Sequence, residues 1–513
     1  MPATLTYPGV YIEEIASGVR TVTGVSTSVT AFIGRSAKGS VNQAVVINSF
    51  ADFERQFGGL WLDSHLGYAV RDFYLNGGSQ AVIVRLYNAH AVDPAKASVD
   101  LAAAAETLTL ETANEGAWGN HLQVSIDHTI EAGVAEQYGL TVDELFNLSI
   151  EDTLSAETEQ FLNLSLKDSA RRINKVLENE SKLLRVSTDL DSLTEDRPDI
   201  VADVAMTVLG ADGERLDAAS LLGSQSQKTG LYALEKTDIF NLLCIPPYTA
   251  DANVDSNVLA AAVAYCEDRR AFMLIDAPSS WHDKEDAKTG ITSLGVNSKN
   301  AAVFFPRVIQ ADPLRSNQLE EFVPCGAIAG TMARIDTDRG LWKAPAGLDA
   351  TLSGISQLSV LLTDDENGEL NPLGINCLRT MPASGPVIWG SRTLQGNDRL
   401  ASEWKYIPVR RLALHIEESL YRGTRWVVFE PNDEPLWIQI RLNITGFMHT
   451  LFRQGAFQGQ TPKQAYFVKC DKETTTAEDI ERGVVNIVVG FAALKPAEFV
   501  VIKLQQIANQ TAL

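Results

Sequence analysis

The sequence predicts a multidomain protein of the α/β (α+β) class with an extended strand at each end of the chain. Length is the first reason, because 513 residues exceed what one hydrophobic core usually organises and imply two to four domains. The second is the alternation of apolar, strand-like runs with helical spacings between residues 239 and 310. The third is a β-rich segment at each terminus, with too few large apolar groups to build its own core.

The N-terminal residues form the first extended arm. Pro8-Gly9 blocks a helix, and from Val19 to Thr30 nearly every second residue is β-branched, which favours a strand. Such a strand must join the edge of a sheet, either in its own domain or in a neighbouring subunit. The residues of this arm that we expect to make the contact are Tyr7, Pro8, Gly9, Val10, Tyr11, Ile12, Val22 and Val25.

Residues 44–87 predict a compact α/β unit. A strand at 44–47 precedes a helix, Phe50 to Phe57, that Ser49 caps. A second helix, Leu66 to Leu75, ends at Asn76-Gly77-Gly78, and the run from Ala81 to Tyr87 is a buried strand.

Residues 91–230 predict an acidic, β-rich insertion. This region holds 26 Asp and Glu residues against 10 Lys and Arg, and so carries −16 of the formal charge of −22. Strands are expected near 108–110 and 122–126, and the spacing of Ile173, Val176 and Leu177 suits a helix. The negative charge argues against a nucleic-acid partner, because phosphates would be repelled.

Residues 231–349 predict a β-α-β unit with parallel strands. The expected strands are 240–245, 271–276 and 301–306, with a helix from Val254 to Arg270. The small apolar residues between Val323 and Arg334 indicate a buried helix.

The C-terminal part predicts helices, short strands and a second arm. We expect helices at 413–421 and 437–453, and strands at 426–429, 465–470 and 483–493. The alternating run from Glu498 to Gln506 predicts a terminal strand. Its apolar members are Phe499, Val501, Ile502 and Leu504.

No residue pattern predicts catalysis, a cofactor or a metal site. The loop Gly34–Ser40 has no lysine between its second glycine and the serine, so the cation of a phosphate-binding loop is misplaced. His121 and His128 have no further ligand at a suitable spacing. Five scattered cysteines fit reduced thiols in a cytosolic protein. We expect neither a secretory signal nor direct membrane insertion, since no run of eighteen apolar residues occurs.

Taken in order, several short motifs resemble the sheath proteins of contractile phage tails and related bacterial injection systems. No single motif is decisive, but their order over nearly the whole chain is specific. Residues from about 130 to 225 carry no match. The matching stretches are 7–14, 30–34, 76–78 with the strand 81–87, 116–120, 340–347, 375–379, 389–394, 406–411 and 429–432.

This resemblance implies a structural subunit and not an enzyme. Such subunits form a helical homopolymer of stacked rings, six per ring, around an inner tube protein, and contraction drives the tube through a target envelope. Terminal arms exchange strands between neighbours. The further implied partners are baseplate and tail terminator or cap proteins, with assembly in the cytoplasm into a phage tail or a contractile injection particle.

The resemblance also suggests a division of the chain. Residues 1–25 would be the N-terminal arm, and 498–513 the C-terminal strand arm. An inner sheath domain would combine 26–90 with 350–497, an acidic outer insertion would occupy 91–230, and an α/β middle domain 231–349.

Contact with the tube is expected through the helix 437–453 and the loop after it. Arg441 lies off the apolar stripe, and Arg453 and Gln454 end the helix, so all three can face an acidic tube. Solvated or capping arginines are an equally good interpretation. Two other functions remain open: a non-contractile tail or capsid-associated subunit, and a soluble enzyme with an α/β core at 239–310.

Overall fold

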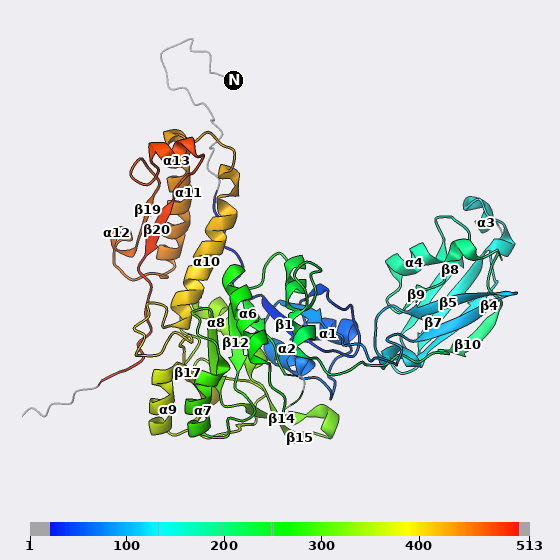
Figure 1. The fold of residues 1–513 in the computed structure, drawn as a ribbon, viewed down its shortest axis with the longest axis horizontal. Coiled ribbons are helices and arrows are strands. Elements are labelled where there is room, and N and C mark those ends of the chain that lie inside the picture. The colour runs from blue at the N-terminus through cyan, green and yellow to red at the C-terminus, as the bar shows by residue number, and fades with distance from the viewer. Residues whose placement is uncertain (1–20, 132, 195, 248, 250, 502–513) are drawn as a thin grey trace, which may run out of the picture.

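The computed structural model describes residues 21–501 except 132, 195, 248 and 250, and its centre is an eight-stranded sheet (Figure 1). The strand order is β18-β17-β13-β12-β11-β1-β3-β2. The six central strands are parallel, whereas β2 and β18 are antiparallel to their neighbours at the two edges. The parallel arrangement of the strands predicted at 239–310 is confirmed. The bounds are β1 (Thr30–Gly34), β2 (Ala44–Ile47), β3 (Ala81–Arg85), β11 (Leu242–Cys244), β12 (Phe272–Asp276), β13 (Ala301–Phe305), β17 (Ile375–Met381) and β18 (Gly385–Ile388).

Helices cover both faces of this sheet. On one face α2 (Leu66–Leu75) packs on α8 (Cys325–Arg339), with α1 (Phe50–Phe57) beside them. The two helices can approach closely because Gly326 has no side chain. A Cβ at this position would lie 1.9 Å from the carbonyl oxygen of Ala69. The other face carries α6 (Ser256–Asp268), with α5 (Ala218–Leu222), α7 (Lys284–Gly290) and α9 (Asp364–Leu370). A small sheet, β15-β14-β16, lies beside this body, with β14 (Val308–Asp312), β15 (Gln318–Phe322) and β16 (Gln357–Leu358).

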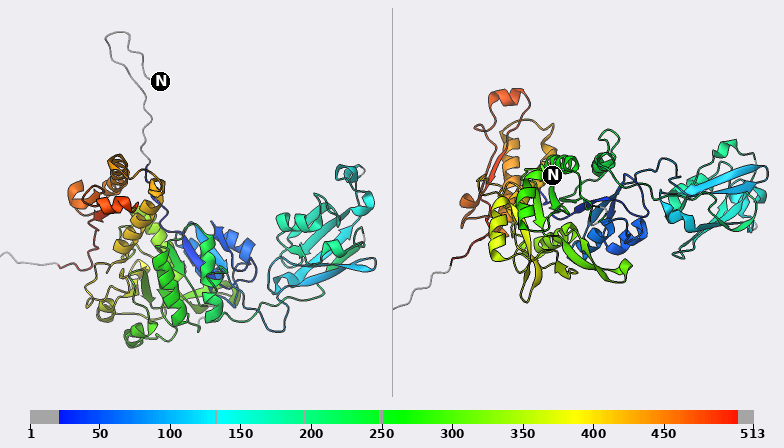
Figure 2. Two further views of the ribbon diagram at one scale, coloured as in Figure 1. Left: turned by 45° about the horizontal axis from the view of Figure 1, so that its top comes forward. Right: turned by 60° about the horizontal axis from the view of Figure 1, so that its bottom comes forward.

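The acidic insertion is a separate lobe with its own core, apart from the central sheet (Figure 2). One sheet has the order β10-β6-β7-β8 and the other β4-β5-β9. The buried Arg85 ties the lobe to the body, because its guanidinium donates to the carbonyl oxygens of Ser36, Gly39 and Glu115. The bounds are β4 (Ser98–Ala103), β5 (Glu106–Thr112), β6 (Leu122–Asp127), α3 (Val134–Gln137), β7 (Phe146–Asp152), β8 (Thr158–Leu164), α4 (Ile173–Glu180), β9 (Leu184–Val186) and β10 (Val201–Ala205).

Residues 407–493 form a further unit, here called the C-terminal helical domain. It contains α10 (Ile407–Gly423), α11 (Glu434–Arg453), α12 (Pro462–Ala465), β19 (Tyr466–Lys469), α13 (Ala477–Glu481) and β20 (Val488–Phe491). The predicted apolar stripe of α11 is confirmed, since it supplies six of the fourteen buried residues in the core of this domain. The stripe residues are Trp437, Ile440, Ile444, Phe447, Met448 and Leu451.

Three predictions of local structure are wrong. Residues 21–29 form no strand, because Val22 and Val25 contact α10 and only Val29, directly before β1, hydrogen-bonds beside β11. The predicted strand 426–429 lies in a turn that contains the 3-10 helix Arg425–Val427. The helix predicted from Ala413 begins at Ile407, since a proline, here Pro408, is well tolerated in the first turn of a helix.

The eight-stranded sheet crosses the boundaries drawn from the sequence. Its strands come from residues 26–90, 231–349 and 350–497, so these three segments share one folded body. The division of that body into an inner and a middle layer of an assembly stays a prediction.

Candidate functional site

The N-terminal segment, residues 21–29, runs along α10 before it enters the sheet as β1. Val22 is buried in the same core as Leu412 and Ile416 of α10. The segment approaches the end of this helix closely, since a Cβ at Gly423 would lie 2.7 Å from Cγ1 of Val22. The backbone N–H of Val25 donates to Oγ of Ser419 at 3.1 Å. Of the predicted arm residues, Val22 and Val25 are therefore held within the chain, while residues 7–12 lie outside the described part.

A buried ion pair secures the base of this segment. Arg411 of α10 and Asp336 of α8 are 2.6 Å apart, and each side chain is only 4% exposed. Arg411 also donates to the carbonyl oxygen of Thr27 at 3.0 Å, and Ser28 Oγ donates to Asp336 at 2.6 Å. The same charged pair thus joins two helices and the incoming chain.

The C-terminal segment, residues 494–501, is held at one point by Glu498. Its carboxylate accepts two hydrogen bonds from the fully buried Arg392, at 2.6 and 2.9 Å. Asn371 and Tyr406 donate to the same carboxylate at 2.8 and 3.0 Å. Burial opposes ionisation of Glu498, but the hydrogen bonds from Arg392 and Asn371 outweigh it and hold the pKa of this carboxyl below its usual range. We call this arrangement the Glu498 clamp.

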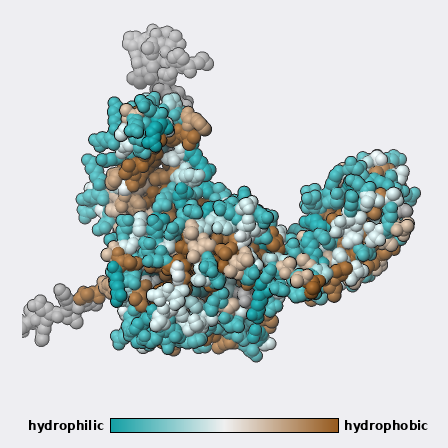
Figure 3. Space-filling view, viewed as in Figure 1, coloured by the Kyte–Doolittle hydropathy of each residue, from teal (hydrophilic) through white to brown (hydrophobic). Residues whose placement is uncertain are grey.

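Beyond the clamp the chain leaves the protein surface with an apolar run. Phe499, Val500 and Val501 are 73, 81 and 79% exposed, and Figure 3 shows apolar surface where the described chain ends. No strand forms among residues 498–501, and Ile502 and Leu504 lie outside the described residues. Most of the surface of these three apolar side chains is therefore open to a partner.

The two ends of the described chain flank opposite ends of α10. Val22 lies at Gly423, the last residue of the helix, whereas Glu498 is bound by Tyr406, the residue that precedes it. A helix of 17 residues is about 25 Å long. The predicted arms are therefore not brought together but leave the subunit at separated points.

Close to α11 lies a short antiparallel sheet with open edges. β19 pairs only with β20 among the described strands, so the outer edge of each has no strand beside it. Phe467 and Val488 are 51 and 44% exposed, and apolar surface over this region is visible in Figure 3. A two-stranded sheet with free edges and an apolar face can accept a further strand.

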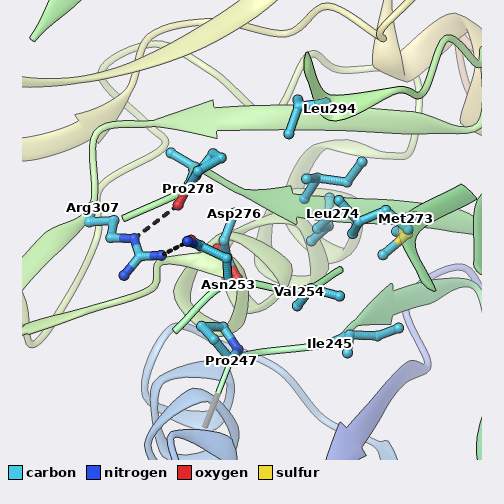
Figure 4. Close-up of a pocket in the computed structure, with 13 residues that line it drawn as sticks. Ile245, Pro247, Asn253, Val254, Met273, Leu274, Asp276, Pro278, Leu294 and Arg307 are labelled. Carbon is cyan, nitrogen blue, oxygen red and sulfur yellow. Dashed lines mark hydrogen bonds between the residues drawn. The ribbon is translucent and has the colours of Figure 1, made fainter. Parts of the chain in front are cut away.

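The carboxyl ends of β11 and β12 hold the pocket drawn in Figure 4, where an α/β enzyme would bind its substrate. Its cavity is about 40 Å³, which suits water and not a metabolite. Arg307 donates to the carbonyl oxygen of Ala277 and to Oδ1 of Asn253, and Asp276 accepts the N–H of Cys325 at the start of α8. These polar groups hold loops and a helix end. In the described part of the chain no three His, Cys, Asp or Glu side chains converge as metal ligands would.

Family models match most of the chain outside the acidic lobe. Residues 222–394 match the central domain of phage tail sheath proteins, and residues 401–507 match their C-terminal domain. The chain belongs to the tail sheath protein family. The resemblance seen in the sequence is thereby confirmed.

Solved sheath structures share the fold of this sheath protein. The sheath of PVC, an extracellular contractile injection system, in its contracted state has a TM-score of 0.60 at 22% identity, with 98% of each chain covered. The contracted helical sheath of the anti-feeding prophage gives 0.59 at 23% identity, covering 98% of this chain and all of the other. A sheath tail protein from Listeria innocua gives 0.61 at 14% identity, covering 92 and 96%. No curated protein sequence matches the chain.

The sheath protein places its predicted tube-contact residues along and at the end of α11. Arg441 donates to the carbonyl oxygen of Cys470 and to the carboxylate of Glu434, so its guanidinium is already paired within the subunit. Arg453 and Gln454 are exposed, and Gln454 borders an open groove of about 420 Å³ lined by Leu341, Trp342 and Leu412, among others. Contact with a tube through these three residues stays a prediction. Every helix within the described residues is too short or too polar to cross a bilayer.

The Glu498 clamp is the functional feature that sequence reasoning missed. Arg392 belongs to a motif that the sequence singled out, and Glu498 begins the predicted arm. Their pairing spans 106 positions, and no local pattern signals it.

Proposed function

We propose that this sheath protein forms stacked six-membered rings around an inner tube, and that contraction of the polymer drives the tube through a target envelope. The fold shared with the contracted sheaths of two injection systems supports a contractile polymer. The proposed partners are further copies of the chain, an inner tube protein, a baseplate and a terminator or cap. Assembly would take place in the cytoplasm, and the product would be a phage tail or an injection particle.

The observation that carries the proposal is the exposed apolar run next to the Glu498 clamp. The clamp fixes the point where the chain leaves the subunit, and the three residues after it have no place on their own subunit. The open edges of β19 and β20 offer a complementary surface on a neighbour. We propose that the C-terminal arm, and the N-terminal arm on another side, add strands to this sheet.

Strand addition suits a polymer whose subunits must move without separating. Main-chain hydrogen bonds give affinity that does not depend on the orientation of the rest of the subunit. A contact that repeats from one subunit to the next without closing also generates a helical filament. The energy for contraction would then be stored at assembly, as a contact difference between two arrangements of the same subunits.

The test is electron microscopy of purified protein with each arm removed. The full chain is expected to form long striated tubes, and chains without residues 1–20 or without residues 499–513 should remain folded but form none. Circular dichroism and thermal unfolding establish that each shortened chain is folded. Normal tubes from both shortened chains would refute strand exchange, and compact particles from the full chain would refute the sheath polymer itself.

A further inference from the structure

The turn between α10 and α11 presents an aromatic side chain that is fully exposed and packs against no other described residue. Phe429 is fully exposed, at 102% of its reference area, and the preceding Val428 is 63% exposed. The backbone of Phe429 has φ of 70°, in the left-handed region that bulky residues avoid. The subunit therefore holds a large apolar ring in water and in an unfavourable backbone conformation. No contact within the described part of the chain offsets the cost of either feature.

The turn is nevertheless rigid. Asn432 accepts a hydrogen bond from Nε1 of Trp437 at 2.9 Å and donates to the carbonyl oxygen of Val484 at 3.0 Å. Asp433 caps α11 by accepting the N–H of Leu436 at 3.1 Å, and the N–H of Glu430 donates to the carbonyl oxygen of Val427 at 3.1 Å. Backbone strain held in place by surrounding contacts is typical of functional positions. A rigid, exposed aromatic side chain is also the usual anchor of a protein interface.

The position of this turn identifies its partner. The N-terminal segment reaches the same end of α10, where Val22 packs at Gly423, six residues before Phe429. The twenty residues that precede the described segment can span about 65 Å when extended. A neighbouring subunit that binds this arm is tethered beside the turn, and a tether raises the effective concentration of the partner for any contact near its base.

We infer that Phe429 is an inter-subunit anchor that inserts its ring into an apolar pocket on a second copy of this chain. The inference rests on the proposed polymer and adds a contact that the exchange of strands does not supply. It also gives a reason for the left-handed backbone of Phe429, which would be retained for a contact with a neighbour.

Phe429→Asn is the decisive variant, because asparagine tolerates the left-handed conformation and removes the ring. We expect its monomer to unfold at the same temperature as the wild type or higher. We expect its critical concentration for polymerisation, measured by sedimentation, to rise about 30-fold, the effect of losing one interface hot spot. Phe429→Leu should restore part of the loss. Leu154→Asn, at a side chain in the acidic lobe that is 77% exposed, is the matched control and should polymerise normally.

The results separate this inference from the proposed function. Wild-type protein that forms no polymer refutes the proposed function, whereas wild type and Phe429→Asn that polymerise equally refute only the anchor. An equal loss in Leu154→Asn would refute a specific role for Phe429. A photo-reactive phenylalanine analogue at position 429 identifies the partner in assembled particles: cross-linking to a second copy supports the inference, and cross-linking only to the tube protein overturns it.

Discussion

Replacing Glu498 by glutamine is expected to release the C-terminal segment while leaving the domains folded. The change removes the charge from a carboxylate that accepts four hydrogen bonds, two of them from Arg392. Arg392 is fully buried, and its remaining ionic partner, Asp398, is 47% exposed at 3.1 Å. Removing one partner of a buried pair costs about 3–5 kcal/mol, and the 18% exposure of Glu498 brings the expected cost to about 2–3 kcal/mol.

The assay is cleavage after Phe499 by chymotrypsin. A protease binds residues on both sides of the bond that it cuts, so cleavage requires Glu498 to leave the clamp. A loss of about 2 kcal/mol in local stability speeds this cleavage about 30-fold, while cleavage in the folded body stays unchanged. Glu403→Gln is the matched control, because Glu403 is exposed. Since the pKa of Glu498 is lowered in the folded state, the clamp is fully formed above the usual pKa of a glutamate. It is lost as the pH falls through the lowered value, so acid should reproduce the effect of the mutation. An unchanged cleavage rate in Glu498→Gln would show that the carboxylate does not hold the segment.

Three further predictions concern the body of the subunit. Arg411→Ala should lower the free energy of unfolding by about 3 kcal/mol, because it leaves the buried carboxylate of Asp336 without its partner. Arg339→Ala, at an exposed pair, should lower it by less than about 1 kcal/mol. Denaturant titrations measure both changes. Gly326→Ala should destabilise by about 3 kcal/mol or more, or prevent folding, because the added methyl meets the backbone of α2. Gly446→Ala on the open face of α11 should instead stabilise by about 1 kcal/mol, and equal effects of the two changes would contradict the packing argument. Burial raises the pKa of Asp276 to about 6, so the folded state binds more protons than the unfolded state between about pH 4 and about pH 6. The free energy of unfolding should therefore fall by about 2 kcal/mol as the pH rises from about 4 to about 6. Asp276→Asn should remove that slope in unfolding curves recorded across this range.

Sequence periodicity found the elements whose apolar pattern is local. The helices α2 and α11 and the strands β3 and β12 follow directly from spacings within each segment, and Ser49 caps α1 as its side chain and position predict. The β-branched run before Thr30 does not form the predicted strand because Val22 packs on α10 and most other residues of the run are exposed or half-buried; a β-branched side chain can serve either kind of packing. The composition of 426–429 predicts a strand, yet this segment connects two helices and pairs with no described strand.

The site was predictable only in part. The composition of the two ends of the chain predicted an arm at each end. Of the residues predicted for these arms, the structure describes Val22, Val25, Phe499 and Val501. The side chains that hold these ends are distant in sequence. Arg392 and Ser419 reach segments more than 100 and 390 positions away, and a single sequence carries no record of such pairs.

The attachment of the two chain ends to α10 has a mechanical consequence. Ser419 and Arg411 hold the N-terminal segment to this helix, and Tyr406, immediately before it, holds the C-terminal segment. In a polymer linked through both ends, tension that enters by one link would pass to the other through α10, about 25 Å long, and through the central body, which α10 joins by the pair Arg411–Asp336 and which holds Glu498 by Arg392. The acidic lobe lies apart from this connection. The lobe could therefore turn with its subunit without carrying the load between neighbouring subunits.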